Sequence, residues 1–159
     1  MLAIGGRAPE FTLPDQDDNS VSLSTFLRRS PLVLYFYPAD FAPACTREAC
    51  AMRDLHADLE RAGLQVAGVS PQPPARHREF RERHRLPFTL LADTDKAVAR
   101  MYDVVGPLGI GVRRATYVID QARHIRDAVL ADFRLGRHEA LVRRAIALSA
   151  GGAPPDRPA

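Results

Sequence analysis

Two cysteines, Cys45 and Cys50, are the residues of this 159-residue chain whose type and spacing suggest redox chemistry. Cys45 falls in the first turn of a predicted helix, where free backbone N–H groups and the positive end of the helix dipole favour a thiolate. Cys50 lies five residues further along that helix. In an unbroken helix the two Cα atoms would be about 8–9 Å apart, whereas a disulfide needs less than about 7 Å. The pair can therefore oxidise only if the first turns of the helix unwind.

On spacing alone a second interpretation stays open, in which both cysteines are small buried hydrophobic residues. Most free cysteines in proteins are of this kind. The spacing C-x4-C is neither the usual spacing of a dithiol oxidoreductase nor a zinc-binding pattern. Two cysteines also exclude a disulfide-rich scaffold and a four-cysteine zinc site.

Alternating apolar runs and helical patterns predict one α/β domain over residues 1–149, followed by a flexible tail at 150–159. The apolar run 32–37 predicts a strand that is buried on both faces. Further strands are predicted at 64–69, 88–91, 116–119 and 125–130, the last two forming a hairpin. Helices are predicted at 43–62, 75–85, 95–102 (with Asp93 or Thr94 as N-cap) and 135–149 (with Leu141, Ala145 and Leu148 on one side). Residues 12–27 are expected to add one or two N-terminal strands.

The composition is that of a soluble globular protein, with 46% hydrophobic and 26% charged residues. No apolar run approaches the ~20 residues that span a bilayer, and the N-terminus lacks the pattern of a secretory signal. We therefore expect a cytoplasmic protein with no membrane partner. A net charge of +3 is too small an excess to indicate a nucleic-acid site. The locally basic stretch 76–85 predicts a solvated amphipathic helix, the alternative being a basic docking face.

The segment YFYPADFAPACTREAC, from Tyr35 to Cys50, resembles the active-site segment of the peroxiredoxins (AhpC/TSA-like proteins). It is most similar to the subgroup called bacterioferritin comigratory protein or peroxiredoxin Q. Residues 8–15, 69–93 and 114–120 resemble other parts of this family, so the resemblance covers roughly residues 7–148. It implies a thioredoxin-like fold, in which helices flank a central mixed β-sheet and the N-terminus carries peroxiredoxin additions.

The resemblance also implies a role for each residue of the site. Cys45 would be the peroxidatic cysteine, whose thiolate attacks hydrogen peroxide or a small organic hydroperoxide and becomes a sulfenic acid. Cys50 would be the resolving cysteine, which forms an intramolecular disulfide that thioredoxin or a similar dithiol reduces. Arg114, rather than the neighbouring Arg113, would stabilise the thiolate and the peroxide. Pro38 would shield the pocket.

The residues implied to bind the substrate, Ala42, Pro43 and Ala44, depart from the family pattern. The family has Thr or Ser at position 42, and this subgroup usually has Gly at position 44. Loss of one charge-assisted hydrogen bond would cost ~1.5–3 kcal/mol, or roughly 10- to 150-fold in rate. The alternative function is therefore a redox sensor or thiol–disulfide relay, with the same cysteine switch and low peroxidase turnover.

The remaining polar residues are given structural interpretations. Glu48 matches a glutamate common in the subgroup, but we expect it on the helix surface. No metal, haem or flavin is implied, and five histidines without ligand spacing are expected to be surface or structural residues: His56, His77, His84, His124 and His138. Because an intramolecular disulfide needs no second subunit, a monomer is expected rather than a dimer.

Overall fold

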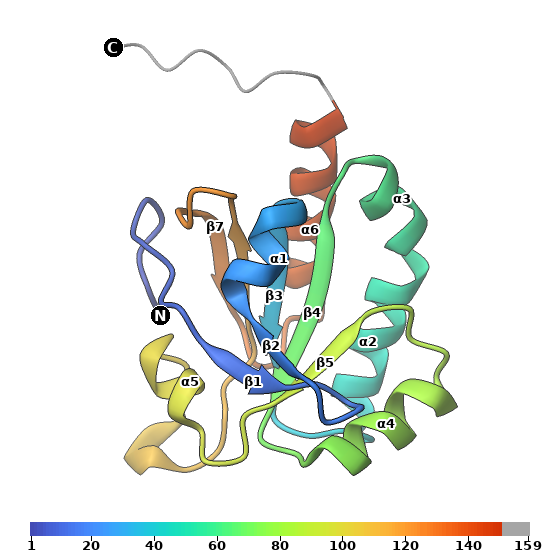
Figure 1. The fold of residues 1–159 in the computed structure, drawn as a ribbon, viewed down its shortest axis with the longest axis vertical. Coiled ribbons are helices and arrows are strands. Elements are labelled where there is room, and N and C mark those ends of the chain that lie inside the picture. Colours follow the sequence, from blue (N-terminus) through green and yellow to red (C-terminus); the bar gives the residue numbers. More distant parts are fainter. Residues whose placement is uncertain (151–159) are drawn as a thin grey trace.

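A five-stranded mixed β-sheet forms the centre of the structure, a computed structural model that describes residues 1–150 (Figure 1). Across the sheet the strands are ordered β5-β4-β3-β6-β7. Their bounds are Thr89–Ala92 for β5, Gln65–Ser70 for β4, Leu32–Phe36 for β3, Ala115–Ile119 for β6 and Ile125–Leu130 for β7. β3, β4 and β5 are parallel, β6 runs antiparallel to β3, and β7 runs antiparallel to β6.

β3 is buried along its whole length, as its continuous apolar sequence predicts. One of its side chains, Tyr35, crosses over the neighbouring β4 at Gly68, its register partner. A Cβ atom at Gly68 would lie 2.9 Å from the Tyr35 ring. Glycine at this position therefore makes room for a tyrosine that packs beneath the site described below.

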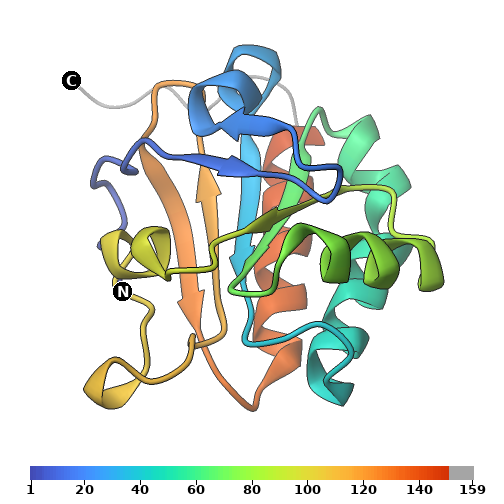
Figure 2. The same ribbon diagram turned by 60° about the horizontal axis from the view of Figure 1, so that its bottom comes forward.

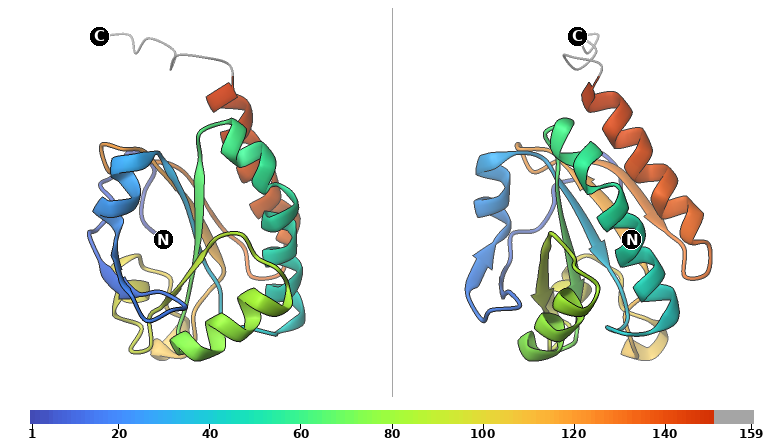
Figure 3. Two further views of the ribbon diagram at one scale, coloured as in Figure 1. Left: turned by 45° about the vertical axis from the view of Figure 1, so that its right-hand side comes forward. Right: turned by 90° about the vertical axis from the view of Figure 1, so that its right-hand side faces the viewer.

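Helices cover both faces of the sheet, which gives the three layers visible in Figure 3. One face carries α2 (Pro43–Asp54), α3 (His56–Arg61), α4 (Pro74–Arg83) and α6 (Leu135–Ala150), and their apolar sides share one core with the sheet. The other face carries α1 (Leu23–Arg29), α5 (Ala97–Met101) and the small hairpin of β1 (Thr12–Pro14) and β2 (Ser20–Ser22). A short 3-10 helix, η1 (Pro107–Gly109), precedes β6.

The structure corrects several details of the predicted elements. The predicted helix 43–62 is divided at Leu55, and residues 12–27 contain the start of α1 as well as the two strands. Leu148 is exposed on α6, where Val142 and His138 are buried instead. The predicted helix 95–102 is shortened to Ala97–Met101, and its N-cap is Lys96 instead of Asp93 or Thr94. The Asp93 carboxylate still accepts hydrogen bonds from the N–H groups of two α5 residues. The predicted tail at 150–159 lies outside the described residues from 151 onward.

The strand register brings three distant segments together at one end of the sheet. Phe36 at the end of β3 pairs with Ala115 at the start of β6, and Ala115 pairs with Leu130 at the end of β7. The β3–α2 loop, the residues preceding β6 and the β7–α6 connection therefore meet at the end that Figure 2 turns forward. No helix in the described residues is long and apolar enough to cross a membrane.

Candidate active site

Cys45 lies in the first turn of α2, as predicted, and is only 1% exposed. The helix begins at Pro43, whose fixed φ and missing N–H suit a first helical position. Ala42 is the N-cap, and no side chain of the described residues caps the helix there. The first backbone N–H groups of α2 are therefore not neutralised by a capping side chain, which favours negative charge at this end of the helix.

The loop that leads into α2 is held in an unusual backbone conformation at Phe41. Its φ of 65° is in the left-handed region, which bulky residues rarely adopt. Contacts with α4 hold the ring: it packs edge-on against Phe80 with 5.1 Å between ring centroids, and the Arg76 guanidinium lies 4.5 Å from its centroid. The packing on α4 thus compensates for local strain four residues before Cys45.

Arg114 is the cation of the site. It precedes β6 and is 3% exposed, and its Nη2 donates a hydrogen bond to the Cys45 Sγ at 3.3 Å. Its Nη1 donates to Glu48 Oε2. The neighbouring Arg113 instead forms an ion pair with Asp132 at 2.9 Å, so only one of the two arginines reaches the sulfur. Asp132 also accepts a hydrogen bond from the Arg114 backbone N–H at 3.0 Å. The same carboxylate therefore holds the Arg113 side chain on one side while the Arg114 side chain points to the sulfur.

Glu48 is buried, with 3% of its surface exposed, so the expected position on the helix surface is wrong. It lies three residues after Cys45 and therefore on the same side of α2, the side that packs against the sheet and α6. Burial raises the pKa of Glu48 from 4.5 to about 7, although Arg114 opposes this change. The i,i+3 spacing from Cys45 is the signal in the sequence that would have placed Glu48 in the site.

Arg114 keeps its charge in this buried environment. Burial would lower its pKa, but the negative charges of Glu48 and Cys45 outweigh burial and raise it. A permanently charged guanidinium in contact with a buried sulfur stabilises a thiolate and can donate hydrogen bonds to a second acceptor. The arrangement can therefore generate a nucleophilic sulfur and hold a negatively charged oxygen beside it.

His138 of α6 adjoins this cluster, and nothing in its sequence spacing indicated that it would. It is 1% exposed, and its Nε2 donates a hydrogen bond to the Ala131 carbonyl at 2.8 Å. Thr116 Oγ1 lies 2.8 Å from its Nδ1, and Glu48 Oε1 lies 3.7 Å from the same nitrogen. Burial lowers the pKa of His138, with a further contribution from Arg114, so its neutral form is favoured.

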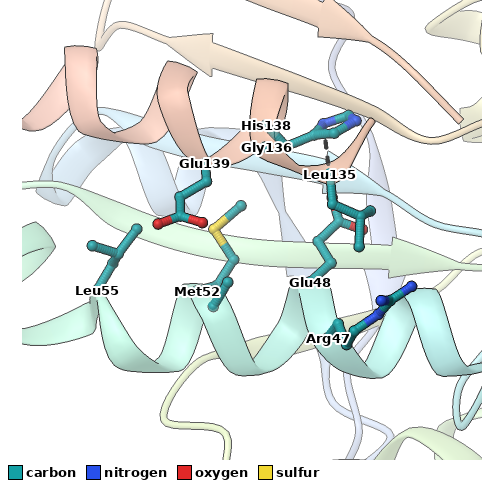
Figure 4. A pocket seen from close by; sticks show the side chains of 9 residues that line it. Arg47, Glu48, Met52, Leu55, Leu135, Gly136, His138 and Glu139 are labelled. Atoms are coloured by element: carbon teal, nitrogen blue, oxygen red, sulfur yellow. Dashed lines mark ion pairs between the residues drawn. The ribbon is translucent and has the colours of Figure 1, made fainter. Parts of the chain in front are cut away.

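A cavity of about 200 Å³ lies between α2 and the N-terminal turns of α6. Figure 4 shows Glu48 and His138 facing one another from the two helices, with the ion-pair contact between them marked. Met52, Leu55 and Leu135 supply most of the apolar lining. Glu48 lines this cavity, whereas its partner Arg114 is not among the lining residues.

A second buried polar cluster lies on the other side of the β3–α2 loop. Asp40 accepts hydrogen bonds from the Tyr37 hydroxyl and from His77 Nδ1, both at 2.6 Å. His77 Nε2 also donates to the Leu91 carbonyl at 3.0 Å. The Asp40 and His77 side chains are fully buried, so this cluster ties the loop to α4 and to the edge strand β5. The sequence analysis anticipated a structural role for His77 but not its partner Asp40.

The other predicted site residues surround Cys45 along the loop and the first turns of α2. Pro38 and Pro43 are exposed, and Ala42 and Ala44 are half-buried. Cys50 is also half-buried, and both cysteines are free thiols in the described part of the chain. Three residues after Cys50, Arg53 donates a hydrogen bond to the His84 carbonyl at 2.8 Å, which ties the second half of α2 to the end of α4.

Comparison with known proteins gives consistent results. The family model described as the AhpC/TSA family matches residues 4–128. "Peroxiredoxin Q, chloroplastic" of Oryza sativa subsp. japonica is 48% identical over 118 residues, which are 74% of this chain and 54% of that protein. The chain thus spans about half the length of such curated relatives.

Solved structures resemble the chain over most of its length. The crystal structure of peroxidoxin BcpB from Mycobacterium tuberculosis aligns with a TM-score of 0.87 and 33% identity, covering 97% of this chain and 100% of that one. A Xanthomonas campestris bacterioferritin comigratory protein, whose structures were studied for alkyl peroxide reduction, aligns with a TM-score of 0.80 and 25% identity, covering 88% and 92%. The thioredoxin-like peroxiredoxin fold expected from the sequence is confirmed.

Proposed function

The chain belongs to the AhpC/TSA family, and from this premise we propose that it is a thiol peroxidase that reduces hydrogen peroxide and small organic hydroperoxides. The observation that carries the proposal is the 3.3 Å hydrogen bond from Arg114 to the buried Cys45 sulfur at the start of α2. A thiolate is the nucleophilic form of cysteine. Both the helix N-terminus and the guanidinium favour that form at this position.

In the proposed reaction the Cys45 thiolate attacks one oxygen of the peroxide. A sulfur–oxygen bond forms as the oxygen–oxygen bond breaks, and the leaving oxygen takes up a proton and departs as water or an alcohol. Arg114 stabilises the charge that develops on the leaving oxygen, because its further N–H donors are fixed in one plane beside the sulfur. Ala42, Pro43 and Ala44 would border the peroxide, and Pro38 would shield it.

We further propose that Cys50 resolves the sulfenic acid by forming a disulfide with Cys45, which thioredoxin or a similar dithiol then reduces. In the regular helix α2 the two Cα atoms are about 8–9 Å apart, too far for a disulfide. The first turns of α2 must therefore unwind. The Asp40–His77 pair before α2 and the Arg53–His84 hydrogen bond after Cys50 bracket the segment that has to move.

A second candidate function follows from Ala42. This residue is the N-cap of α2, three residues before Cys45, and it offers no hydroxyl to the thiolate or to the peroxide. A slow peroxidase with the same cysteine pair would act as a redox sensor or thiol–disulfide relay. Turnover of peroxide in the presence of thioredoxin separates the two functions.

We place the proposed activity in a single domain, residues 1–149, acting as a monomer in the cytoplasm. An intramolecular disulfide requires no residue from a second subunit. Recycling of a disulfide by a dithiol also requires a reducing compartment, in which thioredoxin keeps thiols reduced. The relatives of this chain from plants carry the word chloroplastic in their names, which describes those proteins.

The first experiment is stopped-flow oxidation of the reduced protein by equimolar hydrogen peroxide, followed by measurement of the intact mass. We expect a reaction orders of magnitude faster than that of free cysteine, ending with the loss of two hydrogens. A rate no better than that of a free thiol would argue against the peroxidase and in favour of the sensor or relay.

Two variants assign the two cysteines. Cys45→Ser should abolish peroxide consumption, and full activity in this variant would exclude the proposed nucleophile. Cys50→Ser should react once with peroxide at the normal rate, stop as a sulfenic acid and be over-oxidised readily. An unchanged steady state of Cys50→Ser with thioredoxin would show that another thiol resolves Cys45.

A further inference from the structure

Glu48 has one carboxyl oxygen whose hydrogen-bonding needs are not met. Oε2 accepts from Arg114, but Oε1 is buried and has no hydrogen-bond partner among residues 1–150. A buried carboxylate oxygen without a donor is costly, because it has lost water and gained nothing in return. The polar atom that faces it from α6 is His138 Nδ1, at 3.7 Å.

The hydrogen bonds of His138 determine whether its Nδ1 can donate or accept a hydrogen bond. Its Nε2 lies against a carbonyl oxygen, which can only accept, so Nε2 carries a proton. In the neutral ring Nδ1 is then an acceptor, and it receives the hydroxyl proton of Thr116. Neutral His138 therefore offers a lone pair, and not a donor, to Glu48. Only a proton placed on Oε1 or on Nδ1 makes the contact between these two side chains favourable.

The charges of the buried cluster also require a proton on Glu48 or on His138. Cys45, Arg114 and Glu48 are all nearly inaccessible to water. A Cys45 thiolate and a Glu48 carboxylate would share a single guanidinium, leaving a net charge of −1 in a dry site. If Glu48 and His138 carry one proton between them, the thiolate has the full charge of Arg114 to itself.

We propose that Glu48 and His138 form a proton-holding pair that receives the proton of the Cys45 thiol when the thiolate forms. The transfer keeps the cluster neutral: a thiol, a guanidinium and a carboxylate become a thiolate, a guanidinium and a carboxylic acid. His138 acts as a positioning residue: its Nδ1 accepts the hydrogen bond of the protonated Glu48 once the Thr116 hydroxyl turns its proton away and the 3.7 Å contact shortens. This inference rests on the proposed function only in taking the Cys45 thiolate as the reactive species.

The directions of the pKa changes agree with this assignment. The pKa of Glu48 is raised by burial to about 7, and the pKa of His138 is lowered by burial. When the pair holds a proton, that proton therefore resides on Glu48 rather than on His138. The charged or titratable groups that face the pair from the surrounding elements are Cys45 and Arg47 on α2, Arg114 before β6, Tyr35 on β3, Asp132 before α6, and Arg137 and Glu139 on α6.

The cavity between α2 and α6 adjoins the pair. Glu48 and His138 both line it, whereas Cys45 and Arg114 are not among its lining residues.

Infrared difference spectroscopy of the reduced protein tests the pair directly and without peroxide. We expect a carboxylic-acid carbonyl band that loses half of its intensity near pH 7 and is absent in Glu48→Gln. Cys45→Ser removes the neighbouring thiolate, so the midpoint of this band should fall by about one pH unit. Cys50→Ser is the matched control and should leave the midpoint unchanged. A band that is missing above pH 6, or that titrates identically in Cys45→Ser, would overturn the proposal.

A double-mutant cycle separates positioning by His138 from a purely structural role. In His138→Gln the amide can donate to Glu48 Oε1 and stabilise the carboxylate. The pH at which half of Cys45 reacts with iodoacetamide should therefore rise by about one unit. In a Glu48→Gln background the same substitution should cause no rise. An equal rise in both backgrounds would mean that His138 only supports the fold, and would overturn its assignment as a positioning residue.

The two experiments remain informative if the protein turns out not to be a peroxidase. Both report on the ionisation of Cys45 and Glu48 in the reduced protein, and neither uses peroxide or thioredoxin. Slow peroxide turnover with an intact Glu48–His138 titration would contradict the proposed function alone. Fast turnover without that titration would contradict the proton-holding pair alone.

Discussion

Two buried clusters of acidic and basic side chains flank the start of α2, and they differ in how completely their hydrogen bonds are satisfied. In the Asp40–His77 cluster, both carboxylate oxygens and both ring nitrogens have partners at 2.6–3.0 Å. In the Arg114–Glu48 cluster, the guanidinium contacts a reactive sulfur and one carboxyl oxygen has no hydrogen-bond partner within residues 1–150. The first cluster is complete without a ligand, whereas the second can still accept a proton or bind a ligand.

This difference distinguishes a cluster suited to stabilising the fold from a cluster suited to taking part in a reaction. A fully satisfied buried pair is costly to break, because the remaining partner keeps its charge without compensation. A partly satisfied pair is less stabilising, but its groups can change their protonation state at modest cost. We therefore expect substitutions in the Asp40–His77 cluster to act mainly on stability and substitutions in the Arg114–Glu48 cluster to act mainly on the peroxide reaction.

The largest expected effect is the loss of stability in His77→Leu. This change leaves Asp40 buried without its main partner and should lower the free energy of unfolding by about 3–5 kcal/mol, with Tm falling by about 10 °C. Urea unfolding measures the change, and His56→Gln is the control because His56 is partly exposed. In protein that remains folded, Cys45 oxidation should slow by less than tenfold. A stable variant that has lost peroxide reactivity would contradict the assignment of this cluster as an anchor.

Arg114→Gln should lower the rate of Cys45 oxidation strongly and the stability of the fold less. The rate of Cys45 oxidation should fall by about 10²–10³-fold, the usual cost of removing one donor that stabilises developing charge. Stability should fall less than in His77→Leu, because Glu48, with a pKa of about 7, can take up a proton when its cation is removed. Arg113→Gln is the matched control, since Arg113 pairs with Asp132 instead of the sulfur. Equal losses of rate in the two variants would show that Asp132, and not the contact with Cys45, explains the effect.

The smallest effect is expected at Ala42, which lies between the two clusters along the chain. Ala42→Thr should raise the rate of Cys45 oxidation by about tenfold if the hydroxyl bonds to the thiolate or peroxide. Threonine at this N-cap could also bond to a backbone N–H of α2, which would stabilise the helix by about 1 kcal/mol. Stopped-flow kinetics and urea unfolding separate the two uses of the hydroxyl. A gain in stability with a flat rate would show that the hydroxyl caps the helix and does not assist the reaction.

Local patterns in the sequence predicted the framework that positions the site. The five strands of the central sheet and the first turn of α2 were found because continuous apolar runs and a proline at the helix start are local signals. α1 was missed because it is only seven residues long and directly follows a strand. The resemblance to the peroxiredoxins supplied Arg114, which spacing alone could not connect with a cysteine 69 residues away.

The features of the site that could not be predicted from the sequence are polar side chains that become buried when distant elements pack together. A glutamate and a histidine are usually exposed, and Glu48 and His138 are buried because α2 and α6 pack on the same face of the sheet. That contact depends on the register that places the end of β7 beside the start of β6. Asp40 likewise has no local signal, because its partner His77 lies 37 residues away on α4.

The left-handed backbone at Phe41 has a consequence for the lifetime of the proposed sulfenic acid. Opening of the loop on the proposed route to the disulfide releases a strain of order 1 kcal/mol and breaks the contacts of the ring with Phe80 and Arg76. In the proposed mechanism, the balance between the released strain and the lost contacts contributes to how long a sulfenic acid at Cys45 persists before Cys50 reaches it. During that interval a second peroxide can convert it irreversibly to a sulfinic acid. We therefore expect a single aromatic residue outside the proposed catalytic contacts to influence the peroxide concentration at which the protein begins to inactivate itself.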